Sequence, residues 1–162
     1  MSGLAEWVRN FRGLHERARQ GALRPGEETT YLALRDELAR AMLAAQKLSL
    51  KPGETARKAL RVARALQIEL KIGAERERTL TLDISTGGFS AMLAKPPVLG
   101  ELVGVSLRLN STETISCRAS LVDVKPLTGS ARVAGRFVDL APADLERLEM
   151  LVIDVVLQMF EP

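Results

Sequence analysis

The spacing of apolar residues changes partway along the chain, from a helical repeat to a strand repeat. Before residue 50, apolar side chains recur at steps of three and four, which predicts two amphipathic helices. Gly21 follows the first stripe, where a helix is expected to end, and the second helix is expected to begin at Pro25, a typical first residue of a helix. The first 50 residues are therefore expected to form an αα-hairpin. Its two buried stripes consist of Leu4, Trp7, Val8, Phe11, Leu14 and Ala18, and of Tyr31, Leu34, Leu38, Met42 and Ala45.

From residue 65 onward, apolar residues alternate with polar ones, as they do in half-buried strands. In the second stretch, Leu80, Leu82 and Ile84 are predicted to share one face. Six short strands joined by turns favour an antiparallel barrel or sandwich. The stretches are residues 65–72, 79–84, 89–93, 103–109, 115–121 and 133–140, with turns at 110–112 and 125–130.

The last predicted element is a helix that begins at Pro142. Between residues 151 and 160 it is apolar on nearly every side, interrupted by Asp154 and Gln158. Such a helix must be covered on more than one face. A barrel would cover one face, and the N-terminal hairpin or a second subunit would have to cover the other. A homodimer formed through this helix or through the hairpin is therefore one of the expected arrangements.

Charge and composition narrow the range of partners. The net charge of +3 comes from 23 basic and 20 acidic residues, which is too balanced to indicate a nucleic-acid-binding protein. The start of the chain lacks the pattern of a signal peptide, and the most apolar stretch, about ten residues, is too short to span a bilayer. The single cysteine suits a reducing compartment. A cytoplasmic protein without a membrane span is expected.

Nothing in the sequence indicates catalysis or a cofactor. His15 is the only histidine, and it lies at the edge of an apolar stripe, where a packing role is expected. No second histidine or cysteine is available to build a metal site with it. Cys117 falls on the inward face of an alternating strand, which predicts a small buried residue and not a nucleophile. The protein is expected not to be an enzyme.

Two short motifs carry the chemistry of the chain. Residues 57–61 read RxxxR, and residues 83–88 read DxSxxG. Either motif alone has an ordinary explanation, because the first could be a solvated basic linker and the second a hairpin turn built of common turn residues. In this order, about twenty residues apart and followed by a series of strands, they resemble the signature of PilZ domains. The resemblance covers about residues 57–160.

The PilZ resemblance implies a six-stranded antiparallel barrel with a C-terminal helix, here preceded by the αα-hairpin. The expected domains are residues 1–50 for the hairpin, 51–64 for a linker that carries RxxxR, and 65–162 for the barrel and its helix. The family comprises receptors for the bacterial messenger cyclic di-GMP. The resemblance therefore implies a ligand with two guanines and two phosphates, and no further cofactor.

The resemblance also implies which residues bind that ligand. Arg57 and Arg61 would hold guanine and phosphate groups, because the planar guanidinium donates paired hydrogen bonds to both. Asp83 would accept hydrogen bonds from the N–H groups of guanine, and Ser85 would offer a hydroxyl. Gly88 would allow a close approach of the backbone. Secondary contributions are expected from Lys58, Arg64 and Gly87.

Three functions are compatible with these patterns to different degrees. The first is a non-catalytic cyclic di-GMP receptor that changes conformation on binding and signals through a protein partner. The second is an interaction module of the same fold that binds no nucleotide and docks through its helical ends. The third is nucleic-acid binding through the basic segment, which the absence of aromatic residues beside the arginines argues against. The output pathway is not encoded in any of these patterns.

Overall fold

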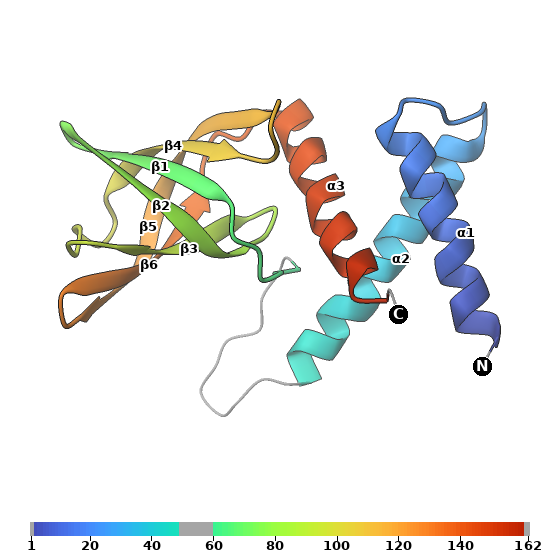
Figure 1. Ribbon diagram of the computed structural model, residues 1–162, viewed down its shortest axis with the longest axis horizontal. Helices are drawn as coiled ribbons and strands as arrows, with labels where there is room; N and C mark the ends of the chain where they lie inside the picture. The colour runs from blue at the N-terminus through green and yellow to red at the C-terminus, as the bar shows by residue number, and fades with distance from the viewer. Residues whose placement is uncertain (1, 49–59, 161–162) are drawn as a thin grey trace. The chain divides into compact units, whose positions relative to one another are not determined.

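The structure is a computed structural model that describes residues 2–48 and 60–160. The chain divides into two compact units, one made of residues 1–60 and 153–162 and the other of residues 61–152. The second unit contains all six strands, and the first contains both N-terminal helices (Figure 1). Each unit has its own buried apolar core.

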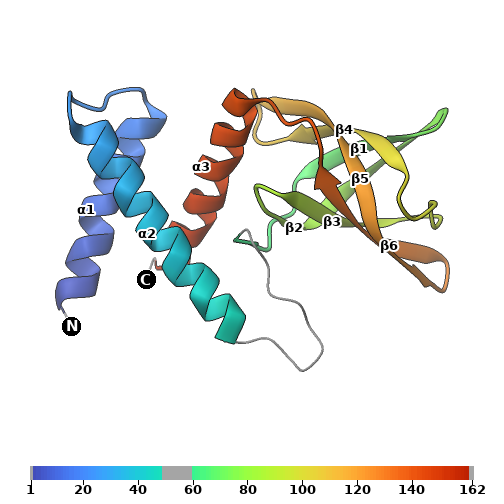
Figure 2. The ribbon, with the colours of Figure 1, turned by 180° about the vertical axis from the view of Figure 1, so that it is seen from behind.

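The six strands form a closed antiparallel barrel in the order β1-β2-β3-β6-β5-β4, which confirms the predicted fold class (Figures 1 and 2). Closure leaves no edge strand open for pairing with another chain. The interior is filled by fully buried side chains such as Leu70, Phe89, Leu107 and Leu121. The strands are β1 (Gln67–Ile72), β2 (Glu75–Ile84), β3 (Gly88–Leu93), β4 (Leu102–Arg108), β5 (Thr114–Leu127) and β6 (Ser130–Phe137).

One prediction about the second strand is wrong. Leu80 and Leu82 do not share a buried face with Ile84, since both leucines are exposed and Ile84 is fully buried. The pairing of β2 with β3 shifts register between Thr81 and Asp83, which marks a β-bulge. The bulge inverts the alternation, so that Thr81 is buried and Asp83 lies on the outer surface of the barrel. A strict period of two could not reveal this extra residue.

The last hairpin of the barrel is longer than its apolar pattern indicated. β5 continues to Leu127 and β6 begins at Ser130, whereas residues 125–130 were predicted to be a turn. Gly129, with φ of 76°, supplies the left-handed conformation of the tight turn between them. The extension carries mostly exposed side chains, so hydrophobic alternation gave no signal for it.

The first unit contains the predicted helical hairpin, α1 (Ser2–Arg19) and α2 (Glu27–Leu48). Gly21 has a φ of 68°, as expected for the residue that ends a helix. The second helix begins at Glu27 and not at Pro25. The carboxylate of Glu27 accepts a hydrogen bond from the backbone N–H of Arg24 at 2.8 Å, which lowers the pKa of Glu27 and closes the first turn.

His15 is part of the core of the first unit. It is buried at 2% exposure, with Nδ1 2.7 Å from the hydroxyl of Tyr31 and Nε2 2.5 Å from Oδ1 of Asp154. The rings of Phe11, His15 and Tyr31 stack on one another. Both ring nitrogens therefore have protein partners, which fits the packing role predicted for this histidine.

The C-terminal helix, α3 (Pro142–Gln158), begins at the predicted residue. Its residues up to Val152 group with the barrel, and those from Ile153 onward group with the hairpin. Within the hairpin unit, Arg12 donates a hydrogen bond to the carbonyl of Leu157 at 2.9 Å, beside the contact between His15 and Asp154. The hairpin thus contributes to covering the apolar end of this helix. Across residues 2–48 and 60–160, no helix combines the length and apolarity that crossing a membrane requires.

Candidate functional site

The segment that precedes β1 is fastened to β2 by a short row of hydrogen bonds. Val62 and Ile84 exchange two backbone hydrogen bonds of 2.9 Å each. The hydroxyl of Thr81 donates to the carbonyl of Arg64 at 2.6 Å and accepts from the N–H of Leu66 at 2.9 Å. Because Thr81 is buried, these bonds are protected from water. Residues 61–66 therefore follow the end of β2 that carries Asp83.

This arrangement brings Arg61 to Asp83. Nε of Arg61 lies 3.4 Å from Oδ1 of Asp83, and the two side chains are 31% and 16% exposed. Oδ1 of Asp83 is buried, yet it has no hydrogen-bond partner among the described residues. An ionised oxygen without a hydrogen bond is costly to keep out of water, which marks Asp83 as a group prepared for a further donor.

Ser85 and Gly87 form the tight turn between β2 and β3. The hydroxyl of Ser85 accepts hydrogen bonds from the backbone N–H groups of Gly87 and Gly88, both at 3.1 Å. Ser85 is 6% exposed, and its N–H donates to the carbonyl of Gly88 at 2.9 Å. The serine that was predicted to offer a hydroxyl to a ligand thus has an evident role in closing the turn.

Gly88 is required by strand packing. A Cβ at this position would lie 2.0 Å from the carbonyl oxygen of Gly135 on β6, far inside van der Waals contact. The close approach that only glycine allows is therefore between β3 and β6. Its effect on the site is indirect, because it holds the outer surfaces of β2, β3 and β6 together as one face.

Three more polar residues lie on that face and were not found from the sequence. Ser90 of β3 is opposite Asp83, is 2% exposed, and has a hydroxyl without a hydrogen-bond partner in the described chain. Arg132 of β6 approaches Asp83, with Nη2 4.0 Å from Oδ2. Arg136 is exposed four residues further along β6. We call the outer surface formed by Asp83, Ser90, Arg132 and Arg136 the β2–β3–β6 face.

The other predicted residues have different outcomes. Arg57 and Lys58 lie outside the described residues, so the first half of RxxxR has no structural account. Arg64 is exposed, and its interaction with Thr81 uses its carbonyl group. Of the RxxxR and DxSxxG motifs, the structure brings together Arg61 and Asp83. The added residues were missed because only strand register, which sequence spacing did not give, places β6 beside β3.

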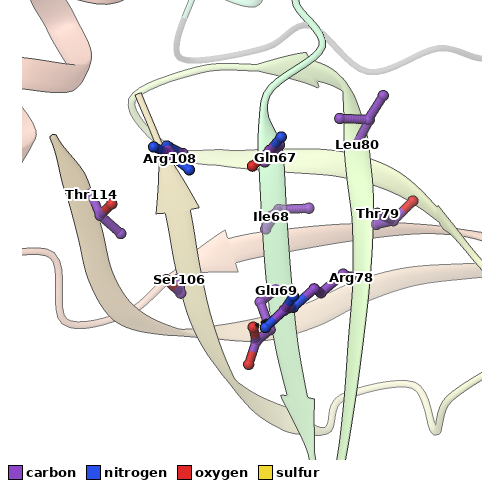
Figure 3. A pocket seen from close by; sticks show the side chains of 9 residues that line it. All are labelled: Gln67, Ile68, Glu69, Arg78, Thr79, Leu80, Ser106, Arg108 and Thr114. Carbon is purple, nitrogen blue, oxygen red and sulfur yellow. Dashed lines mark hydrogen bonds and ion pairs between the residues drawn. The ribbon is translucent and has the colours of Figure 1, made fainter. Parts of the chain in front are cut away.

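A second polar surface lies on another part of the barrel. An open pocket of about 590 Å³ is formed by the outer surfaces of β1, β2, β4 and β5 (Figure 3). Glu69 in its lining is paired with Arg78, also in the lining, at 3.0 Å and with Arg76 outside it at 3.7 Å. Arg108 donates hydrogen bonds to the carbonyls of Asn110 and Ser111, each at 3.2 Å. We call this surface the pocket face.

Metal binding and thiol chemistry find little support in the described residues. Within residues 2–48 and 60–160, no group of three or more histidine, cysteine, aspartate or glutamate side chains is arranged to hold a metal ion. Burial raises the pKa of the Cys117 thiol to about 11, with Asp139 and Asp144 adding to the shift. A thiol with so high a pKa is protonated at neutral pH and is a weak nucleophile.

Comparison with protein families identifies this barrel. The family profile of the PilZ domain matches residues 55–154, which is more than half of the chain. The matched region includes both motifs, all six strands and most of α3. A comparison with functionally curated proteins finds no match.

Solved structures support the same fold. The motility inhibitor MotI/DgrA of Bacillus subtilis has a TM-score of 0.59 at 22% identity, covering 69% of this chain. The PilZ domain of YcgR from Escherichia coli, solved with c-di-GMP, has a TM-score of 0.55 at 17% identity over 65% of this chain. The K. pneumonia MrkH–c-di-GMP complex has a TM-score of 0.55 at 20% identity, also over 65%. At these identities the likeness is one of fold.

The extent of the match differs among these proteins. It spans 95% of the YcgR PilZ domain but only 59% of the MotI/DgrA chain and 55% of the MrkH chain. What is shared is therefore the barrel region, and the remaining parts of MotI/DgrA and MrkH have no counterpart in the match.

Proposed function

Because the chain belongs to the PilZ domain family, we propose that it is a non-catalytic receptor for cyclic di-GMP. Two of the solved relatives, YcgR and MrkH, contain this ligand, and this chain retains the RxxxR and DxSxxG motifs. The binding residues in this proposal are Arg57, Arg61 and Asp83. Ser85 and Gly88 shape the turn that holds Asp83 in place.

The observation that carries the proposal is the state of Asp83. Its Oδ1 is buried beside Arg61 without a hydrogen bond, so the carboxylate has capacity for an additional donor. The Watson–Crick edge of guanine presents two adjacent N–H donors, which a carboxylate can accept. Arg61 beside it can bridge the guanine acceptors or bind a phosphate oxygen. A motif pair that was only a pattern in the sequence is thus a pair of neighbouring side chains.

The proposed response to the ligand is a rearrangement upstream of Val62. Residues 62–66 are already bound to β2 by backbone and Thr81 hydrogen bonds, so binding need not move them. Ligand binding would instead redirect the side chain of Arg61 and recruit Arg57, which is closer to the helical hairpin in sequence. A change at this point can alter what the hairpin presents to a protein partner.

Calorimetric titration with cyclic di-GMP tests the proposal, with GTP as the control nucleotide. The wild-type chain is expected to bind saturably and the Arg61→Ala variant to lose about 2–5 kcal/mol of binding free energy. For a complex of micromolar affinity, worth about −8 kcal/mol, that loss removes most detectable binding. Arg108→Ala, an equal change of charge on the pocket face, is expected to bind as the wild type does.

The outcomes separate receptor from non-receptor. Undiminished binding by Arg61→Ala would remove the site from this face, and an absence of binding by the wild type would refute the receptor proposal. Thermal unfolding of each variant, followed by circular dichroism, verifies that a loss of affinity is not a loss of fold. Equal heats with GTP would show a general affinity for phosphates.

A second candidate function is a protein-interaction module that binds no nucleotide. It is favoured by the extra helices, since the hairpin core of Phe11, His15 and Tyr31 is additional to the barrel. Met159 and Phe160 leave apolar surface exposed at the C-terminal end of the same unit. A self-associating chain would use this end, and sedimentation of the wild type over a range of concentrations with and without cyclic di-GMP tests it.

A further inference from the structure

Strand β6 presents a second pair of arginines on the β2–β3–β6 face. Arg132, Ala134 and Arg136 occupy alternate positions of β6, whereas Val133 and Gly135 between them are buried. Alternate residues of a strand point to the same side, and positions two apart are about 6.6 Å from each other. The two guanidinium groups therefore flank Ala134, whose short side chain leaves space between them.

Strand register connects this pair to the residues already described. Ala134 is opposite Ser90, and Ser90 is in turn opposite Asp83. Arg136 is opposite Gly88, at the point where β3 and β6 approach each other closely. Asp83 consequently lies between Arg61, 3.4 Å from Oδ1, and Arg132, 4.0 Å from Oδ2. Neither arginine makes a hydrogen bond to Asp83 that would satisfy its buried oxygen.

We propose that Arg132 and Arg136 form the second half of the ligand site, binding the guanine and phosphate that Arg61, beside Asp83, leaves uncontacted. The inference rests on the proposed function, because it assigns residues to the same ligand. Cyclic di-GMP is two-fold symmetric, with two guanines and two phosphates, so groups on one side of Asp83 can match only part of it. The β6 arginines on the other side of Asp83 supply the matching charge.

Two further observations favour a ligand at this position. The hydroxyl of Ser90, buried at 2% exposure, has no hydrogen-bond partner in the described chain, although it lies centrally between β2 and β6. Within the described residues, no acidic side chain forms an ion pair with Arg136. A strand arginine without a counter-ion and a buried hydroxyl without a partner are both groups that an anionic, hydrogen-bonding ligand would satisfy.

The charges on the neighbouring strand β5 are mixed. Asp123 is in register with Ala134, and Lys125 is in register with Arg132. Both side chains are exposed. Asp123 opposes an anion at the Arg136 end, whereas Lys125 favours one at the Arg132 end. The sum over Arg132, Arg136, Lys125 and Asp123 is positive, so this part of the face still attracts a dianionic ligand.

Calorimetry with cyclic di-GMP on Arg132→Ala, Arg136→Ala and the double variant tests the inference in the full chain. Each single variant is expected to bind about ten- to hundredfold more weakly, since each loses a charged hydrogen bond to the ligand. Arg118→Ala is the matched control. Arg118 is also an exposed arginine of the barrel, but it is paired with Asp139 at 2.8 Å. Its replacement with alanine is therefore expected to leave the affinity for cyclic di-GMP unchanged.

A mononucleotide distinguishes a second half-site from a general loss of charge. GMP can occupy only one half, so the double variant should retain the wild-type affinity for GMP at the Arg61 half while losing affinity for cyclic di-GMP. Equal losses for both nucleotides would overturn the inference, because the β6 arginines would then act only by attraction at a distance.

The remaining outcomes separate this inference from the proposed function. If the wild type and both β6 variants bind cyclic di-GMP equally and Arg61→Ala does not bind, the receptor stands and the second half-site is refuted. If the wild type itself does not bind, both are refuted. Unfolding curves of Arg132→Ala are needed in either case, since this arginine also faces Asp83.

Discussion

The β2–β3–β6 face and the pocket face are two polar surfaces of one barrel. They differ in whether their charged groups are satisfied by other groups of the protein. On the pocket face, Glu69 is paired with two arginines, one of them at 3.0 Å with a hydrogen bond. On the β2–β3–β6 face, Asp83 also lies between two arginines, but at 3.4 and 4.0 Å and with a buried oxygen left unbonded. The first arrangement is complete without a ligand, and the second is not.

The comparison shows that a surface pocket is not by itself a binding site. The pocket face has an open volume of about 590 Å³, yet its charged groups mostly satisfy one another or adjacent carbonyls (Figure 3). The β2–β3–β6 face is recognised by polar groups that lack partners, in a protein interior where most buried polar groups have them. Polar groups without hydrogen-bond partners therefore locate the candidate ligand site better than the pocket does.

The largest expected difference between the faces comes from replacing one carboxylate of each face with alanine. Asp83→Ala is expected to weaken cyclic di-GMP binding by about 3 kcal/mol, because it removes the acceptor for the guanine N–H groups. Glu69→Ala removes a carboxylate with the same two-arginine environment from the pocket face and should leave the affinity unchanged. Titration calorimetry on both variants at one salt concentration provides the comparison.

The sign of the Asp83→Ala effect is itself informative. If Asp83 served only as a counter-ion for Arg61 and Arg132, its removal would leave two free positive charges and strengthen the binding of a dianionic ligand. A higher affinity in this variant would therefore contradict the guanine-accepting role. A loss of affinity in Glu69→Ala equal to that in Asp83→Ala would place the binding site at neither face alone.

An intermediate effect is expected from adding one methyl group to Gly88 of the β2–β3–β6 face, compared with Gly104, which is on β4 outside the pocket lining. At Gly88, the new Cβ would be 2.0 Å from the carbonyl oxygen of Gly135, and backbone would have to move. At Gly104 on β4, the nearest atom would be Cβ of Lys71 at 3.3 Å, a contact that small shifts relieve. Gly88→Ala is expected to lower the free energy of unfolding by about 2–3 kcal/mol, and Gly104→Ala by less than 1.

Chemical denaturation of the two alanine variants measures this difference directly. Gly88→Ala should also weaken ligand binding, because moving β3 away from β6 separates Ser90 from the β6 arginines. A Gly88→Ala protein with unaltered stability would show that β3 and β6 do not pack this closely at Gly88. It would also remove the packing explanation for the glycine of DxSxxG.

The barrel and the hairpin followed from sequence because their signals are local. Hydrophobic periodicity predicted six strands and three helices, and a glycine or proline near the end of an element predicted most of its boundaries. The β2 bulge was missed because one extra residue leaves the apolar pattern intact while inverting which side chains are buried. The extension of β5 was missed because exposed strand residues resemble turn residues in composition.

The sequence predicted the site residues that belong to a motif. It did not predict the residues that strand pairing places beside them. DxSxxG identified Asp83, and Arg61 of RxxxR lies 3.4 Å from it. Ser90, Arg132 and Arg136 carry no motif, since their relation to Asp83 depends on the pairing of β3 with both β2 and β6. Ser85 shows the converse limit, because a residue named by the motif uses its hydroxyl to close a turn.

The smallest expected effect distinguishes the two faces at the level of single hydroxyl groups. Ser90→Ala removes a buried oxygen that has no partner in the described chain, so it should not lower the free energy of unfolding and could raise it by about 1 kcal/mol. The same variant should bind cyclic di-GMP about three- to tenfold more weakly if the ligand supplies the missing hydrogen bond. Ser106→Ala, at an exposed position of the pocket face, should change neither quantity. Ser90→Ala with lowered stability and unchanged affinity would mean that its hydroxyl supports the barrel and does not contact the ligand, and the contrast between the faces would then rest on Asp83 alone.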